Sequence, residues 1–160
     1  HPEIDMLGAY IDEFDSQTGE VIATKKTPLT NKEIHKYARR RNPFNNQTLV
    51  YKKSRALSVG GYSNIKRCED YEFVVKMLAD GARGIINLDK TLVMYRVTAN
   101  NYERRRNWAN TKSFVNVRWK IFRMGYSNLW DFIVPCTFQF FIFIMPKSLT
   151  GKIYKRFLRG

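Results

Sequence analysis

The stretch EDYEFVVKMLADG, residues 69–81, has the pattern of one amphipathic helix set among strand-like runs. Its apolar residues recur at the helical spacing i, i+3, i+4 and i+7, in Tyr71, Val74, Val75 and Leu78. Gly81 suits a left-handed stop at the end of this helix. Because strands and helices interleave along the chain, we predict an α/β fold with a mixed sheet flanked by helices.

The other expected elements follow from alternation for strands, caps and spacing for helices, and Gly, Pro and Asn for turns. In the first part of the chain they are a strand at 4–11, a turn at 15–20, a returning strand at 21–26 and a helix from about Lys32, capped by Thr30 or Asn31. A loop at 39–47 and a strand at 48–53 follow, and residues 54–63 hold a short helical turn and then a Gly60–Gly61 turn. The later elements are strands at 84–88 and 91–97 and a helix from about Asn107 to Met124. The first three elements predict a β-hairpin over residues 4–26.

The charge is strongly positive and unevenly distributed. The 160 residues suffice for one domain or part of one, and they carry a formal charge of +14, from 28 Lys and Arg against 14 Asp and Glu. Residues 1–20 hold six of the acids and no Lys or Arg, so the rest of the chain is more basic still. Such a field attracts polyanions: nucleic acid, anionic lipid or a phosphate-bearing substrate.

The cysteines and histidines exclude some classes of site. Cys68 and Cys136 are far apart and lack metal-type spacing, which is typical of reduced intracellular cysteines. His1 and His35 are the only histidines, so a His-rich metal site is excluded. No signal peptide is visible, and the chain begins at His1 almost directly with a strand-like stretch. We therefore expect a portion of a longer protein.

Glu69 and Asp70 have two interpretations. Carboxylates in the first turn of a helix satisfy free N–H groups and complement the positive end of the helix dipole. A carboxylate on a rigid helix end can also act as a general base, taking the proton of a sugar hydroxyl as that hydroxyl attacks. The two roles are compatible, because one acid can cap the helix while the other reacts.

Three ordered motifs carry a resemblance to a known family: NPFNNQTLVYKKSRALSVGGYSNIKRCEDYEFVVKMLADG (42–81), NLDKTLVMYRV (87–97) and NNYERRR (100–106). They resemble the C-terminal half of family 2 inverting glycosyltransferases, GT-A enzymes of the bacterial capsule and surface-polysaccharide kind. In that family an Asn-Pro-x-Asn-His-x-Thr stretch, a Val-Gly-Gly-Tyr turn and a Glu-Asp-Tyr helix start follow one another. The resemblance implies the acceptor-side half of a GT-A (Rossmann-like) domain over 1–106 and a helical, aromatic C-terminal extension over 107–160.

The resemblance also implies roles for single residues. Asp70 matches the catalytic base, with Glu69 as its neighbour in the motif. The implied substrate-binding residues are Gly60, Gly61 and Tyr62 in a turn near the donor sugar, Asn42, Asn45 and Thr48 in the loop on the acceptor side, and Arg96, Arg104, Arg105 and Arg106 near the diphosphate or the lipid-linked acceptor. The implied donor is a nucleotide sugar of the UDP type, and the implied acceptor is a saccharide or a polyprenyl-diphosphate-linked sugar.

Two departures from the family pattern limit these roles. Asn46 stands where the family commonly has His, and an amide cannot titrate near neutral pH. The Asp-x-Asp motif that holds the metal on the donor diphosphate occurs nowhere in this chain. We therefore predict no metal ligand here and expect a divalent metal, Mg or Mn, only in the full-length enzyme. We also expect that this chain alone does not transfer sugar.

The apolar run from Phe132 to Met145 has three interpretations. It is shorter than the ~20 residues of a membrane-spanning helix, and Pro135 and Gln139 interrupt it. It suits a helix in the core or at the interface of a homo-oligomer. It also suits an anchor at an anionic membrane surface, with Trp130 and the Phe cluster among headgroups and basic residues nearby. This third interpretation predicts a cytoplasmic protein held peripherally on the inner face of the cell membrane.

Two other functions fit parts of the sequence. The charge and the interleaved Tyr and Arg allow a basic nucleic-acid-binding module, but no RNP-like, helix-turn-helix or zinc pattern supports it. We therefore expect no nucleic-acid partner. A non-catalytic, membrane-associated scaffold is the other alternative. The arginine runs at 39–41 and 104–106 allow two interpretations, as solvent-exposed surfaces or as contacts to phosphate groups.

Overall fold

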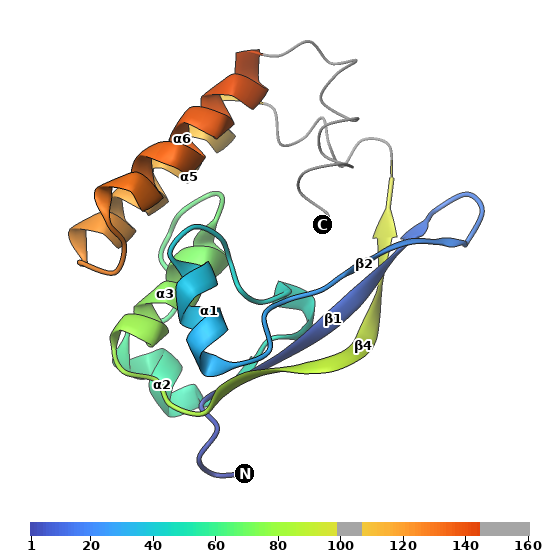
Figure 1. Cartoon of the computed structure of the whole chain (residues 1–160), viewed down its shortest axis with the longest axis horizontal. Coiled ribbons are helices and arrows are strands. Elements are labelled where there is room, and N and C mark those ends of the chain that lie inside the picture. Colours follow the sequence, from blue (N-terminus) through green and yellow to red (C-terminus); the bar gives the residue numbers. More distant parts are fainter. Residues whose placement is uncertain (99–106, 145–160) are drawn as a thin grey trace.

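In the computed structural model, residues 1–98 and 107–144 are described, and they form one sheet with the helices beside it (Figure 1). Its elements are β1 (Met6–Asp15), β2 (Val21–Lys25), α1 (Asn31–Ala38), the 3₁₀ turn η1 (Asn46–Thr48), β3 (Val50–Tyr51), α2 (Lys53–Ser58), α3 (Glu69–Ala79), β4 (Ile85–Val97), α5 (Trp108–Arg123) and α6 (Leu129–Ile144). This arrangement confirms the predicted mixed α/β class.

Strand β1 lies at the centre of the sheet, since the other described strands all pair with it. β4 runs parallel to β1 along its whole length, while β2 and β3 run antiparallel to it. β3 pairs only with Met6 and Leu7, and β2 pairs with Ile11 to Phe14. The sheet is therefore mixed, as expected, and the hairpin of β1 and β2 is confirmed.

Several strand predictions were wrong in their extent. The runs at 84–88 and 91–97 form the single strand β4, which takes up Asp89 and Lys90 as extra residues opposite the step from Ala9 to Tyr10. Such a bulge keeps the pairing intact while both polar side chains stay exposed. The predicted strand at 48–53 shrinks to two residues because the Thr48 side chain, and not its backbone, bonds the backbone of Ala9 in β1.

The helix ends follow local capping chemistry. Thr30 caps α1 with a complete capping box, in which its hydroxyl accepts from the Glu33 N–H and the Glu33 carboxylate accepts from the Thr30 N–H. The side chain of Asn107 accepts from the Asn110 N–H and starts α5, at the predicted place. Gly81, with φ at 80°, follows α3 in the left-handed conformation expected for a helix stop.

Helix α3 is the most deeply packed helix of the described chain. Phe73, Val74 and Val75 are fully buried, and they share one apolar cluster with Met6 of β1 and Ile85 of β4. From α5, Val117 and Ile121 join the same cluster. The predicted apolar stripe of α3 is therefore a core face, and α3 is a rigid mount for the residues at its start.

Helices α5 and α6 form a pair that lies beyond α1 and α3 (Figure 1). The turn between them contains Gly125 in a left-handed conformation, and Gln139 of α6 donates to Thr111 of α5 across a buried contact of 3.2 Å. An ion pair of 2.6 Å joins Asp131 of α6 to Arg40 after α1. None of the helices described is both long and apolar enough to cross a bilayer.

Candidate active site

The first turn of α3 carries three carboxylates in three different environments. Glu72 is buried, with 4% of its surface exposed, and it forms an ion pair of 3.0 Å with Lys120 of α5. Asp70 is half-buried and held by Asn42. Glu69 is half-buried too, and no hydrogen bond links it to another described residue. Glu72 therefore has a structural role, whereas Asp70 and Glu69 in the same helical turn are accessible.

Asp70 uses each of its carboxylate oxygens differently. Oδ1 accepts a hydrogen bond of 2.8 Å from the Tyr71 N–H, which satisfies one of the free donors at the helix start. Oδ2 accepts from the Asn42 side-chain amide at 3.2 Å. A carboxylate offers about four acceptor positions, so two remain for a hydroxyl group. Asp70 therefore caps the helix and can still take a proton.

The residue before these acids holds an unusual backbone conformation. Cys68 has φ 62° and ψ 19°, and it is the only non-glycine residue with positive φ in the described chain. This left-handed conformation costs about 1–2 kcal/mol for an L-residue. Strain of this kind persists only where the surrounding structure fixes it, and it is common at functional sites.

The Gly60–Gly61–Tyr62 turn lies against α3. Gly60 and Gly61 have φ of 74° and 64°, which explains why glycine occupies both positions. The Lys76 ammonium donates to the Gly61 carbonyl at 2.6 Å, and the Tyr62 ring stacks on Phe73 at 4.2 Å between centroids. Two residues of α3 thus fix the turn beside the carboxylates.

The surroundings of Tyr62 shift its pKa. Burial raises the pKa of Tyr62 to about 12, and the Tyr51 hydroxyl and the charges of Asp70 and Glu69 contribute in the same direction. The phenol therefore stays protonated at neutral pH and keeps an O–H donor. Although Tyr62 is partly buried, 46% of its surface is exposed, so a ligand can reach it.

Three contacts hold the loop after α1 against α3 and α5. The Tyr71 hydroxyl donates to the Ala38 carbonyl at 2.7 Å, Arg118 of α5 donates to the Arg40 carbonyl, and Asn42 bonds Asp70. Together they fix residues 38–42 beside the start of α3.

Arg118 is a buried cation that aromatic rings surround. Its guanidinium lies 4.3 Å from the centroid of Phe114 and 5.3 Å from that of Tyr71. Its Nε and Nη1 atoms are buried without a hydrogen-bond partner among the described residues. Burial lowers the pKa of Arg118, and the ring faces replace part of the lost hydration.

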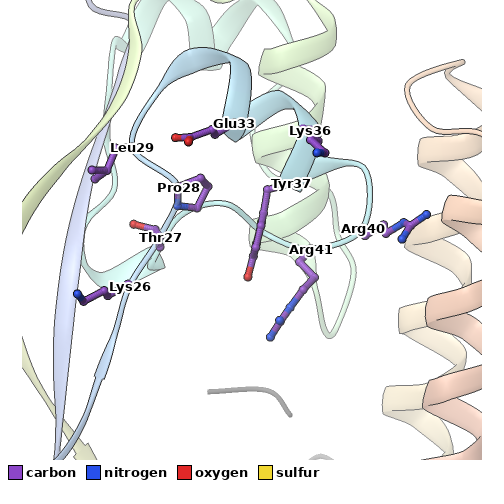
Figure 2. Close-up of a pocket in the computed structure, with 9 residues that line it drawn as sticks. All are labelled: Lys26, Thr27, Pro28, Leu29, Glu33, Lys36, Tyr37, Arg40 and Arg41. Carbon is purple, nitrogen blue, oxygen red and sulfur yellow. The ribbon is translucent and has the colours of Figure 1, made fainter. Parts of the chain in front are cut away.

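A cavity of about 680 Å³ opens next to this loop, between the chain leaving β2 and helix α1 (Figure 2). Pro28, Leu29 and Tyr37 give it an apolar wall. Four basic side chains also line it: Lys26, Lys36, Arg40 and Arg41. The Arg41 guanidinium lies 5.7 Å from the centroid of the Tyr37 ring, and Figure 2 shows these two side chains pointing the same way.

Known proteins resemble this chain along nearly its whole length. Over 157 residues it is 32% identical to the UDP-Gal:alpha-D-GlcNAc-diphosphoundecaprenol beta-1,3-galactosyltransferase of Escherichia coli. The aligned residues make up 98% of this chain and 56% of that protein. It is 30% identical over 153 residues to the amylovoran biosynthesis glycosyltransferase AmsE of Erwinia amylovora, covering 96% of this chain and 55% of that protein. The chain is homologous to bacterial glycosyltransferases of polysaccharide biosynthesis.

A third relative is also a glycosyltransferase. It is an uncharacterized glycosyltransferase of Haemophilus influenzae, 32% identical over 163 residues, which cover 99% of this chain and 58% of that protein. The chain spans little more than half the length of these glycosyltransferases. No protein-family profile matches it, and no solved structure does.

The structure gathers part of the predicted site at the start of α3. Asn42, Asp70, Glu69 and the Gly60–Gly61–Tyr62 turn lie close together through the contacts above. The roles assigned to them stay predictions, but their proximity comes from the fold and not from their spacing in the sequence.

Asn45 and Thr48 have structural contacts. The Asn45 amide donates to the backbone carbonyls of Ala9 and Lys25, at 3.0 and 3.1 Å, and only 1% of this residue is exposed. The Thr48 hydroxyl bonds the backbone of Ala9. These side chains fasten the loop to the sheet, and contact with an acceptor stays a prediction for both.

The predicted arginines lie elsewhere. Arg96 is near the far end of β4, paired in register with Phe14, with its guanidinium 5.7 Å from the centroid of the Phe14 ring. It is eleven residues along β4 from Ile85, which packs with α3. Arg104, Arg105 and Arg106 lie outside the described residues. The described part of the chain has no group of three or more His, Cys, Asp or Glu side chains that fits a metal ion.

The pocket and the buried arginine were not predicted from the sequence. A signal for the pocket existed, because Glu33, Lys36 and Tyr37 recur at i, i+3 and i+4 and so share one side of α1, and Arg40 follows shortly after its end. Arg118 gave no such signal, since a single arginine in a basic helix does not indicate burial.

Proposed function

We propose that this chain forms the acceptor-side part of a family 2, GT-A type glycosyltransferase that inverts the anomeric centre, with Asp70 as general base. The observation that carries the proposal is Asp70 on the rigid start of α3, with one oxygen capping the helix and the other held by Asn42. The homology to bacterial glycosyltransferases gives the reaction class.

The proposed reaction is a single displacement. The acceptor hydroxyl attacks the anomeric carbon of the donor sugar, the bond from that carbon to the diphosphate oxygen breaks, and the nucleotide diphosphate leaves with the electron pair. The Asp70 carboxylate takes the hydroxyl proton as the new bond forms. A positioned base of this kind contributes about 10²–10⁴-fold to the rate. Attack from the side opposite the leaving group inverts the centre.

The Gly60–Gly61–Tyr62 turn is proposed to face the donor sugar. Glycine backbone allows close approach of a ligand, and the Tyr62 hydroxyl is a protonated donor at neutral pH. A divalent metal, Mg or Mn, would stabilise the charge of the departing diphosphate. No described residues fit such a metal, so its ligands are proposed to lie outside them.

The substrates are proposed from the relatives. The Escherichia coli relative is named for a UDP-Gal donor and a GlcNAc-diphosphoundecaprenol acceptor. We propose a UDP-sugar donor and a polyprenyl-diphosphate-linked acceptor for this protein as well. A lipid-linked acceptor places the reaction at a membrane surface, and we propose peripheral binding there through helix α6.

The exposed face of α6 supports this membrane contact. Trp130, Val134, Phe138 and Phe141 recur at steps of three or four residues, so they share one face, and each is at least 38% exposed. Asp131 is the only acid in α6, and it is buried in its ion pair with Arg40. An apolar face without exposed acids is suited to the headgroup region of an anionic membrane.

The test of the catalytic proposal is Asp70→Asn in the full-length protein. We expect turnover to fall at least ~100-fold with the affinity for the nucleotide sugar little changed, because the amide cannot accept the proton. Asp80→Asn, at the other end of α3, is the matched control and should keep normal turnover. Near-normal turnover of Asp70→Asn would remove Asp70 from this role.

A further inference from the structure

The described residues that line the cavity beside α1 include more basic than acidic side chains. Among the described residues that line it, Glu33 is the only acid, and its carboxylate already accepts hydrogen bonds from the Thr30 N–H and hydroxyl, at 3.2 and 2.9 Å. Arg40 is paired with Asp131. In the described chain, neither Lys26 nor Lys36 contacts a carboxylate.

The arrangement of these cations disfavours the empty pocket. Lys26 and Lys36 both line the cavity, and like charges in one cavity repel each other. An anion in the cavity would offset that repulsion. A group with two or more negative charges, such as a diphosphate, matches the number of basic side chains.

The apolar wall of the cavity favours an organic ligand over a bare inorganic anion. Pro28, Leu29 and Tyr37 are each partly buried and turn apolar surface to the cavity. The volume of about 680 Å³ is within the ~300–1,000 Å³ typical of pockets for organic ligands, and it exceeds what a bare diphosphate fills. The lining therefore favours a diphosphate attached to an apolar chain.

The cavity also lies between the carboxylate site and helix α6. On one side it ends at Arg41, and the next residue, Asn42, donates to Asp70. On the other side Arg40 is bonded to Asp131, next to Trp130, which is 68% exposed. Figure 2 shows Arg40 pointing toward the α5–α6 pair, away from Tyr37 and Arg41.

We propose that this cavity binds the diphosphate of a lipid-linked sugar acceptor, with Lys26, Lys36 and Arg41 around the phosphates. This assignment rests on the proposed function, since it names the subsite at which that function holds its acceptor. The phosphates lie among the basic side chains, the first lipid units lie on Pro28, Leu29 and Tyr37, and the sugar points toward Asn42 and Asp70.

Binding of farnesyl diphosphate to the full-length protein tests the assignment without requiring sugar transfer. The test variant is Lys26→Gln with Lys36→Gln, and the matched control is Lys32→Gln with Arg39→Gln, exposed residues in the same region that do not line the cavity. Both pairs remove the same charge. We expect the test variant to weaken farnesyl diphosphate binding about 10-fold or more and the control less than about 2-fold. The thermal unfolding midpoint checks that each variant folds.

Two further probes identify the source of the diphosphate. UDP should bind all variants equally, and inorganic pyrophosphate should bind far more weakly than farnesyl diphosphate. The assignment is overturned if the control pair weakens binding as much as the test pair, if the test pair weakens UDP binding instead, or if pyrophosphate binds as well as the farnesyl compound.

The same binding assay separates this assignment from the catalytic proposal. Asp70→Asn should bind farnesyl diphosphate normally even when turnover is lost. Normal turnover in Asp70→Asn therefore contradicts only the role of Asp70, while normal farnesyl diphosphate binding in the Lys26/Lys36 variant contradicts only the pocket assignment.

Discussion

Among single residues, Asp70 depends most directly on Asn42, which lies 28 positions earlier in the chain and holds its Oδ2 atom. Without that amide, the carboxylate would retain its bond to the Tyr71 N–H but lose the contact that fixes its second oxygen. The direction of the free acceptor positions therefore depends on the loop after α1 as much as on α3.

Asn42→Ala should lower turnover about 10-fold, because a misdirected base contributes less to proton transfer. The Michaelis constant for the nucleotide sugar should change little, since the donor contacts stay intact. Steady-state kinetics of the full-length protein measure both quantities, with Gln47→Ala in the nearby turn η1 as control. A rise in the Michaelis constant without a fall in turnover would instead indicate that Asn42 binds substrate directly.

Asp5 shows how another acid serves only the fold. Its carboxylate is paired with Lys52 at 2.8 Å and Arg55 at 3.0 Å, and it accepts from the Arg83 N–H at 2.8 Å. The hydrogen bond from Lys52 and the other contacts lower the pKa of Asp5 to about 2 from 3.8. The charged form is therefore favoured in the folded state.

This lowered pKa predicts a pH-dependent stability. The folded state binds fewer protons at Asp5 than the unfolded state between about pH 2 and 4, so the stabilisation is present above pH 4 and is lost as the pH falls toward 2. Asp5→Asn should destabilise by about 2 kcal/mol at pH 7, and less at lower pH. Urea unfolding at pH 7 and pH 3 measures the difference. A difference that stays constant with pH would contradict the ion-pair explanation.

Among the elements, the loop at 38–42 connects α1, α3 and α5, and Arg118 is its anchor on α5. The anchor donates a hydrogen bond to the Arg40 carbonyl and lies against the rings of Tyr71 and Phe114. Replacing a buried charge with a long apolar side chain is often close to neutral for stability. The loop, however, would lose its tie to α5.

Arg118→Met should therefore reduce turnover about 10-fold while the free energy of unfolding changes by less than ~2 kcal/mol. Arg118→Lys should restore part of the activity, because an ammonium can still donate to the Arg40 carbonyl. Arg123→Met, at the exposed end of α5, is the control. Full activity of Arg118→Met would show that the loop does not need this anchor.

In the whole molecule, helix α6 is tied to the basic cavity, because Arg40, which lines the cavity, is paired with Asp131 of α6. Figure 1 shows the α5–α6 pair next to α1. A membrane in contact with α6 would bring a lipid-linked acceptor directly to the cavity. The open edges of the small sheet also allow self-association, so a homo-oligomer stays a prediction.

Trp130→Ser with Phe141→Ser should reduce flotation with anionic vesicles about 10-fold or more, since each ring loses apolar contact with the headgroup region. Val50→Ser with Leu92→Ser, exposed apolar residues of the sheet, is the matched control and should float normally. Vesicles of phosphatidylglycerol and phosphatidylcholine serve for both. Equal flotation of the two variants would exclude α6 as the membrane contact.

The sequence by itself determined most of the local structure. Periodicity and caps predicted α1, α3 and α5 within one or two residues, and the turn residues predicted the β1–β2 hairpin. These features depend on neighbours within a few residues, which the sequence shows directly. The ordered motifs also predicted the homology to glycosyltransferases. The order of several motifs along a chain reflects common ancestry, which the sequence shows without knowledge of tertiary contacts.

Only the tertiary structure decided which side chains meet. It separated Glu72, buried against Lys120, from Asp70, held by Asn42, although both stand in the same helical turn. It joined the two strands of 84–97 into one, turned Asn45 and Thr48 toward the sheet, and gathered distant basic residues around one cavity. Each of these outcomes depends on contacts between residues far apart in the sequence, and the packing of α3 against β1, β4 and α5 sets their geometry.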